Sequence, residues 1–191
     1  MNRKLVVVVA VAAVLALLLG AKVGRDLLSP STKAAQRPEV VRFKDEIAKI
    51  SIAYPASWTR LANPANDPEV SLLAAADDSE SVLMRATQVG LAKVTVKTLP
   101  IVRKFTDDLV AADPRVKQLV VPRSVELGGL PGWRYRYTYG SGTSAGAHDH
   151  YFLFKGSLMI QLVFQAVPAA HLPAVAPVFD GIAATFRGNE R

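Results

Sequence analysis

Three alternating segments between Gly128 and Phe164 constrain the fold of this chain more than any other part of it. In the first segment, Trp133 and three tyrosines occupy every second position, with Arg134 and Arg136 between them. In the last, large apolar residues recur at every second position up to Phe164. Side chains of a strand alternate between the two faces of a sheet, so this pattern predicts strands. Because little chain separates the segments, the strands are expected to pair in sequence and antiparallel.

Further strands are predicted on the N-terminal side of this region. Segment 50–55 alternates apolar and smaller residues and ends in a proline. Segments 70–76 and 82–89 flank a polar turn and form a predicted hairpin. Segment 118–127 contains a proline, which cannot donate a hydrogen bond to a neighbouring strand, so it is expected at a sheet edge or at a bulge.

Two helices are predicted in the domain. Thr98 is a candidate N-cap of the first, whose apolar face is expected to consist of Ile101, Val102, Phe105, Leu109 and Val110. The second has apolar residues spaced by three and four positions, namely Leu172, Val175, Phe179, Ile182 and Phe186. Its regular part is expected to start near Pro177. The predicted class is α+β: an antiparallel sheet of about six to seven strands flanked by helices in an α/β/α sandwich.

The N-terminal part of the chain predicts a membrane tether. Residues 1–22 contain a basic head and the apolar run Leu5–Ala21, whose seventeen residues would span roughly 26 Å as a helix. No clean cleavage site follows, which favours a retained single-pass signal-anchor over a cleaved signal peptide that would release a secreted protein. Residues 23–40 are expected to be a flexible tether and residues 41–191 an extracytoplasmic domain.

Charge and cysteine content exclude several classes of function. The net charge is +7, but six basic and two acidic residues place +4 of it within residues 1–40. The domain then carries only +3, and nucleic-acid binding is not expected. The chain has no cysteine, so disulfides, thiol nucleophiles, zinc–thiolate sites and a lipid-modified N-terminal cysteine are excluded.

Four short motifs follow one another along the domain: YPASW, GGLPGWRYRYTY, DHYFLF and PVFDGIAATF. Together with the order of predicted elements, they resemble the PsbP-like superfamily over residues 47–187. That superfamily includes an extrinsic photosystem II subunit, a nuclear Ran-binding protein, and bacterial membrane-tethered or lipoprotein relatives. The resemblance implies an antiparallel sheet flanked by helices, and it implies no catalytic residues.

No motif predicts catalysis, a cofactor or a metal site. His148, Asp149 and His150 form a metal-like string, but His171 is the only other histidine, and a zinc site needs three or four ligands. The glycine-rich stretch GSGTSAG lacks the lysine and the helix of a phosphate-binding loop. No G-x-S-x-G elbow is present. The chain is therefore predicted not to be an enzyme.

One candidate binding face remains in the central strands. Arg134, Arg136, His148 and His150 are predicted to lie together and to bind an anionic group, because arginine suits carboxylate or phosphate. The alternatives are that these residues are only solvated or that their stems lie buried under a helix. The aromatic row on the other face is expected to pack under a helix, with ligand stacking as the alternative.

The predicted function is therefore a non-enzymatic, membrane-anchored extracytoplasmic binding or accessory module that recognises a protein or an envelope component. A domain that binds a small, anionic ligand is the alternative.

Overall fold

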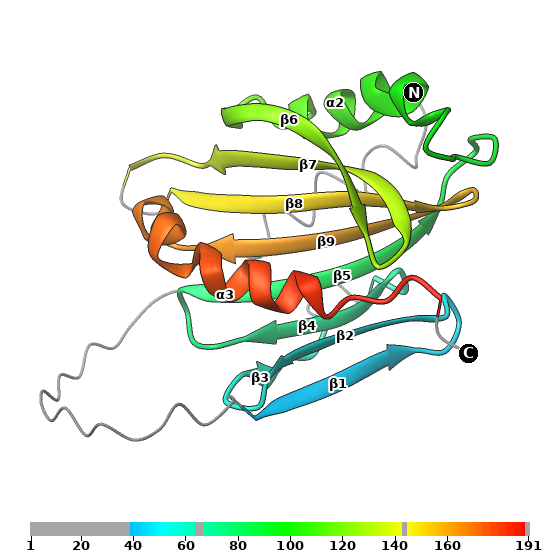
Figure 1. Cartoon of the computed structure of the whole chain (residues 1–191). Coiled ribbons are helices and arrows are strands. Elements are labelled where there is room, and N and C mark those ends of the chain that lie inside the picture. The colour runs from blue at the N-terminus through cyan, green and yellow to red at the C-terminus, as the bar shows by residue number, and fades with distance from the viewer. Residues whose placement is uncertain (1–38, 64–66, 143–144, 190–191) are drawn as a thin grey trace, which may run out of the picture.

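A seven-stranded antiparallel sheet forms the centre of the computed structural model, which describes residues 39–63, 67–142 and 145–189 (Figure 1). Its strand order is β3-β4-β5-β9-β8-β7-β6. The strands are β3 (Thr59–Arg60), β4 (Val70–Ala75), β5 (Glu80–Gln88), β6 (Lys117–Leu127), β7 (Leu130–Tyr139), β8 (Gly146–Lys155) and β9 (Leu158–Ala166). The predicted antiparallel sheet and the sequential pairing of β7, β8 and β9 are confirmed.

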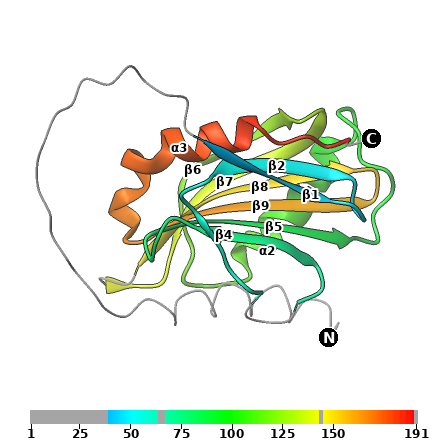
Figure 2. The same ribbon diagram turned by 90° about the horizontal axis from the view of Figure 1, so that it is seen from below.

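One face of the sheet is covered by helix α3 (Leu172–Ala184) and by a separate two-stranded sheet of β1 (Val40–Asp45) and β2 (Ile50–Pro55). Figure 2 shows both lying on the same side of the large sheet, opposite α2. β1 was not predicted from the sequence. After α3 the chain returns to β2, where the amide of Arg187 donates to the carbonyl of Ser51 at 2.9 Å.

The larger hydrophobic core lies between these elements and the sheet. Phe164 of β9 and Phe179 of α3 stack with ring centroids 5.2 Å apart, as expected from the predicted faces. Both side chains are fully buried. The prediction that α3 becomes regular only near Pro177 is wrong, because the helix begins at Leu172 and continues through this proline. Burial of the apolar face along the whole helix offsets the backbone hydrogen bond that proline cannot make.

The opposite face carries the 3₁₀ helix η2 (Leu99–Val102) and helix α2 (Arg103–Ala111). Val102, Phe105, Leu109 and Val110 pack with Tyr135, Phe152 and Phe154 in a second core, as predicted. Ile101 is an exception, since 78 % of it is exposed. Thr98 occupies the N-cap position of η2, as predicted, but its side chain makes no capping hydrogen bond. Its hydroxyl accepts from the amide of Thr95 instead.

Strand β6 forms one edge of the sheet, as the proline at position 122 predicted. Its pairing with β7 shifts register between Val120 and Arg123. In the part of the chain that the structure describes, no helix combines the length and apolarity needed to cross a membrane. The predicted Leu5–Ala21 anchor lies outside the described residues.

Candidate functional site

Arg134 and Arg136 leave β7 on the side of α3 and are already paired with acidic side chains. The Arg134 guanidinium donates to both oxygens of Asp149, with Nε 2.6 Å from Oδ1, and also to Asp180 of α3. Nε of Arg136 donates to Asp149 at 2.8 Å. Asp149 is fully buried and Arg134 nearly so. This cluster therefore joins β7, β8 and α3 by ion pairs.

The electrostatics of this cluster indicate a structural role. Burial acts to lower the pKa of Arg134, but the hydrogen bond and charge of Asp149 outweigh it and raise that pKa. The guanidinium also lies 4.8 Å from the ring centroid of Tyr151, which adds a cation–π contact. With its donors engaged by two carboxylates, Arg134 has little capacity left for an external anion.

His148 and His150 lie on the opposite face of the sheet, so the predicted grouping of four residues is wrong. The β7–β8 register places Arg136 opposite Asp149, and Tyr137 opposite His148. Since side chains alternate along each strand, both histidines share a face with Tyr137 and not with the arginines. Asp149 points away from them, and no group of three or more potential metal ligands occurs among the described residues.

Tyr137 connects the two histidines through a chain of hydrogen bonds. Its hydroxyl is 3.1 Å from Nδ1 of His148 and 3.0 Å from Nδ1 of His150. Nε2 of His148 is 3.2 Å from Oε1 of Gln165, an acceptor, so this nitrogen donates. Nδ1 of neutral His148 then accepts from the Tyr137 hydroxyl, and the hydroxyl oxygen accepts from Nδ1–H of His150. Nε2 of His150 is then an acceptor, and the Gln161 side chain lies within hydrogen-bonding reach of His150.

Burial keeps these groups uncharged. Desolvation lowers the pKa of His148 to about 4, although the hydrogen bond to Gln165 acts the other way. Desolvation, followed by the effect of His148, lowers the pKa of His150 well below its usual value, although a hydrogen bond to Gln161 acts the other way. Desolvation likewise raises the pKa of Tyr137. At neutral pH both imidazoles are therefore neutral, and the predicted role of the histidines as an added positive charge fails.

A second polar group lies beside the histidines on the same face. Gln161 of β9 stands opposite Arg85 of β5 and is diagonal to His150 across the β8–β9 pair. Arg85 is buried and pairs with Glu69, and its Nη2 lies 3.3 Å from Oδ2 of Asp67. Thr87 donates to the same Glu69 carboxylate at 3.0 Å.

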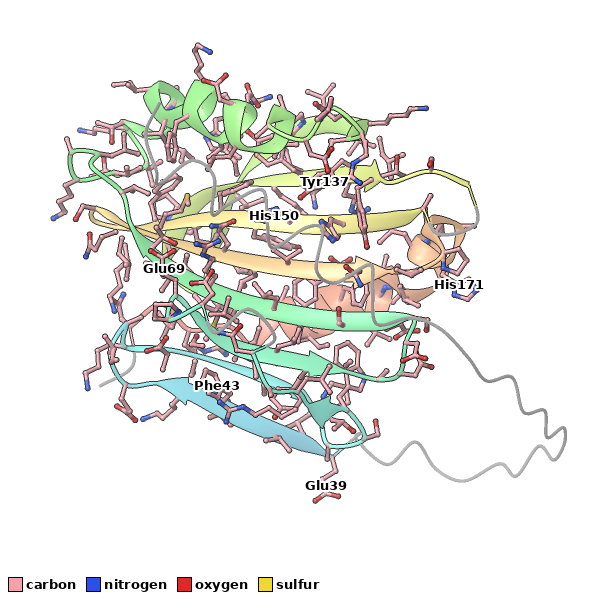
Figure 3. All side chains as sticks on the ribbon, turned by 180° about the vertical axis from the view of Figure 1, so that it is seen from behind. Glu39, Phe43, Glu69, Tyr137, His150 and His171 are labelled. Carbon is pink, nitrogen blue, oxygen red and sulfur yellow. The ribbon has the colours of Figure 1, made fainter. Side chains whose placement is uncertain are left out.

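This side of the sheet holds buried polar atoms that lack hydrogen-bond partners. Within the described residues these atoms are Asp67 Oδ2, Ser71 Oγ, His150 Nε2 and Gln161 Nε2. Ser71 lies in β4 at the register shift between Val70 and Leu72. Figure 3 shows this side of the sheet, with Tyr137, His150 and Glu69 labelled. Asp67 Oδ2 nevertheless lies 3.3 Å from Nη2 of Arg85, and the Gln161 side chain lies within hydrogen-bonding reach of His150. The set is therefore a buried polar cluster, in which Ser71 Oγ is left unpaired.

We name the set Asp67, Ser71, Arg85, His150 and Gln161 the polar face. Of these, the sequence predicted only His150. The signal available was the pair of glutamines, Gln161 and Gln165, which interrupt an otherwise apolar strand. Asp67 and Arg85 are far apart in the sequence and no local pattern joins them.

No protein-family model and no curated protein sequence matches this chain. Solved structures do match. Cyanobacterial PsbP from Synechocystis aligns over 83 % of this chain and 97 % of its own, with a TM-score of 0.60 and 12 % identity. LpqN of Mycobacterium tuberculosis aligns over 80 % and 91 %, with a TM-score of 0.55 and 12 % identity.

The fold is PsbP-like. The Ran-binding protein Mog1p of Saccharomyces cerevisiae has the same arrangement, with a TM-score of 0.53, 8 % identity, and coverage of 80 % of this chain and 97 % of its own. The predicted resemblance is thereby confirmed at the level of the fold. At these identities the PsbP-like fold assigns no function to the polar face, which has to be argued from its own chemistry.

Proposed function

We propose that this chain is a membrane-tethered, extracytoplasmic accessory domain that binds a component of the cell envelope without catalysing a reaction. The binding partner sits on the polar face, and the ion-pair cluster beneath α3 serves only to hold the helix. Residues 1–22 are the proposed membrane anchor, and residues 23–40 are the flexible tether that lets the domain reach its target.

The observation that carries this proposal is the cluster of buried polar side chains on the sheet face opposite α3, in which Ser71 Oγ has no hydrogen-bond partner among the described residues. Leaving a buried donor or acceptor unpaired costs about 1–3 kcal/mol, so a partner that satisfies it gains binding energy. The polar face offers a neutral imidazole, an amide, a hydroxyl and one carboxylate, which can form hydrogen bonds to a binding partner.

The proposed location is supported by the Leu5–Ala21 run, which is too apolar for an exposed segment. It is also supported by the structural similarity to LpqN, a protein involved in cell envelope biogenesis.

Photo-cross-linking in living cells tests the binding face. A photoreactive phenylalanine at Thr87, a partly exposed residue bonded to Glu69, is expected to capture a discrete partner. The matched control is Val178, which is 41 % exposed on α3, on the other side of the sheet. Cross-linked products from Val178 and none from Thr87 would contradict the proposal.

A small ligand in place of an envelope protein is the second candidate. A surface cavity of about 380 Å³ favours it, and this cavity is lined by Ser71, Leu73 and Asn63 among others. Ser71 is the one residue of the polar face that lines this cavity. Ligand sites commonly have volumes of this size, roughly 300–1,000 Å³.

A further inference from the structure

The strand that follows the proposed tether exposes three apolar side chains. Ile47, in the turn between β1 and β2, is 97 % exposed, the largest value for a large apolar residue in the described part of the chain. Val40 and Val41, at the start of β1, are also exposed. We call these three residues the β1 edge. Single exposed apolar residues are common on protein surfaces, but a group of them along one strand indicates a contact surface.

The β1 edge lies on the outer border of the molecule. β1 pairs with β2 along its whole length, and within residues 39–63, 67–142 and 145–189 no other strand pairs with it. Figure 1 shows β1 as the outermost strand on the side away from α2. Val40 and Val41 are consecutive, so their side chains point to opposite faces of the strand. A partner that contacts both has to meet the strand from its open edge.

The place where the tether joins the domain decides what that partner is. The described residues begin at Glu39, one position before β1, and 38 residues precede them. The proposed tether, residues 23–40, has a coil dimension on the order of 25 Å and reaches at most about 65 Å when extended. The bilayer that holds the anchor is therefore the large surface nearest to the β1 edge. The short tether also keeps the effective concentration of this edge at the bilayer high.

The charge around the β1 edge favours an apolar contact over an electrostatic one. Residues 39–49 contain three basic and three acidic side chains, which sum to zero. One opposite pair is already formed, with Nζ of Lys49 3.3 Å from Oε2 of Glu46. Anionic lipid attracts a segment through its excess of basic residues, and this segment has no excess. The contact is therefore expected to depend on the apolar side chains and to be the same on zwitterionic and anionic lipid.

We propose that the β1 edge rests on the bilayer surface, with the side chains of Val40, Val41 and Ile47 among the lipid headgroups. This inference rests on the proposed membrane tether and adds the orientation of the domain on the membrane. Ile101, which is 78 % exposed in η2, lies on the face of the large sheet opposite to β1 and is then turned away from the bilayer. The competing occupant of an open strand edge is a second copy of the chain.

Methyl NMR of the full chain in phosphatidylcholine nanodiscs tests this orientation. The chain has six isoleucines, so labelling of their δ1-methyl groups gives six signals. A nitroxide carried on the lipid headgroup is expected to broaden the Ile47 signal beyond detection, because this methyl group lies beside the headgroups. The signal of Ile101, which is also exposed, is expected to remain. The other four isoleucines are buried and report that the domain is folded, namely Ile50, Ile52, Ile160 and Ile182.

A double variant links the broadening to the β1 edge. Val40→Ser/Ile47→Ser removes two of the three apolar side chains and is expected to lower the equilibrium constant for surface contact by about tenfold. The nitroxide should then no longer broaden the methyl signals of Val41, which are labelled in the same way. Ile101→Ser is the matched control, since it removes an exposed isoleucine from the far side, and it is expected to leave Val41 broadened. Phosphatidylglycerol in place of phosphatidylcholine is expected to change none of these results.

Three results would overturn the inference: equal broadening of Ile47 and Ile101, stronger broadening of Ile101, or unchanged broadening of Val41 in the double variant. A nitroxide on Lys44→Cys of a second copy that broadens Ile47, in lipid without nitroxide, would also overturn it and would make β1 a dimer edge. The outcome for the anchor is separate. A chain that fails to co-purify with nanodiscs contradicts the proposed anchor, whereas a chain that co-purifies without selective broadening contradicts only the orientation.

Discussion

Arg134 of β7 donates to Asp149 of β8 with 2.6 Å between Nε and Oδ1, and both side chains are buried under α3. Asp180 of α3 also pairs with Arg134. The pair therefore fixes a helix to the sheet at a place where an exposed binding surface was predicted.

Arg134→Ala is expected to lower the free energy of unfolding by about 3–5 kcal/mol, because it leaves the Asp149 carboxylate buried with only Arg136 as a partner. Urea denaturation measures the change. The control is Lys104→Ala, which breaks an exposed pair with Asp108 and is expected to leave the midpoint unchanged. Equal midpoints for Arg134→Ala and wild type would show that the pair is dispensable.

Phe164→Ala and Phe179→Ala are each expected to destabilise the protein by about 3–5 kcal/mol, the usual cost of truncating a buried phenylalanine. Because the rings stack, the double variant should lose less than the sum of the two single losses. Val121→Ala serves as the control, since 82 % of Val121 is exposed. Strict additivity of the two phenylalanine variants would argue against the observed stacking.

The stability of the protein is expected to fall as pH is lowered from about 6.5 towards 4. Unfolded histidine binds a proton near pH 6.5, whereas folded His148 binds it only near a pKa of about 4. The unfolded state thus holds more protons in this window, and the slope reaches about 1.4 kcal/mol per pH unit for one such group. His150 acts in the same direction. Urea midpoints of wild type and His148→Gln, compared across this window, measure the effect. A slope that the substitution leaves unchanged would contradict a neutral, buried His148.

Gly132→Ala is expected to destabilise the protein by about 1–3 kcal/mol, as overpacking does in a tight core. A Cβ at this position would lie 2.3 Å from the carbonyl oxygen of Phe152 on the neighbouring strand. Gly181 of α3 is the matched control, because a Cβ there meets no heavy atom within 4 Å. Gly181→Ala should stabilise the helix by about 0.5–1 kcal/mol. Thermal midpoints that shift in the same direction for both variants would count against this packing.

The sequence allowed the faces of individual strands to be predicted, because alternation with period two is a local property. Trp133, Tyr135 and Tyr137 share one face, and Ile160 and Phe164 line the core, as expected. The edge position and irregular pairing of β6 at Pro122 and the apolar face of α3 could be predicted because they too depend on local sequence.

The pairing register of neighbouring strands could not be predicted from the sequence, and the site prediction failed for this reason. The connection after Tyr139 is short, but its length alone does not decide whether Arg136 meets an even or an odd position of β8. A shift of one residue moves every side chain to the other face. The register found places Asp149, and not His148 or His150, beside the arginines.

Polar contacts between residues far apart in the chain could not be predicted from the sequence either. The Arg134–Asp180 pair spans 46 positions and the Ala53–Thr185 hydrogen bond spans 132. No periodicity connects such residues. Ile101 was misplaced because η2 turns with a tighter helical period than the α-helix assumed for that face.

The central claim, a tethered domain outside the cytoplasm, is tested most directly by cysteine labelling. The chain has no cysteine, so Val121→Cys on the exposed edge strand gives a single reactive thiol. A membrane-impermeant maleimide is applied to intact spheroplasts, with Asn2→Cys as the matched variant for the cytoplasmic end. The account predicts full labelling of Val121→Cys before lysis and of Asn2→Cys only after it. Labelling of Val121→Cys only after lysis would contradict the account.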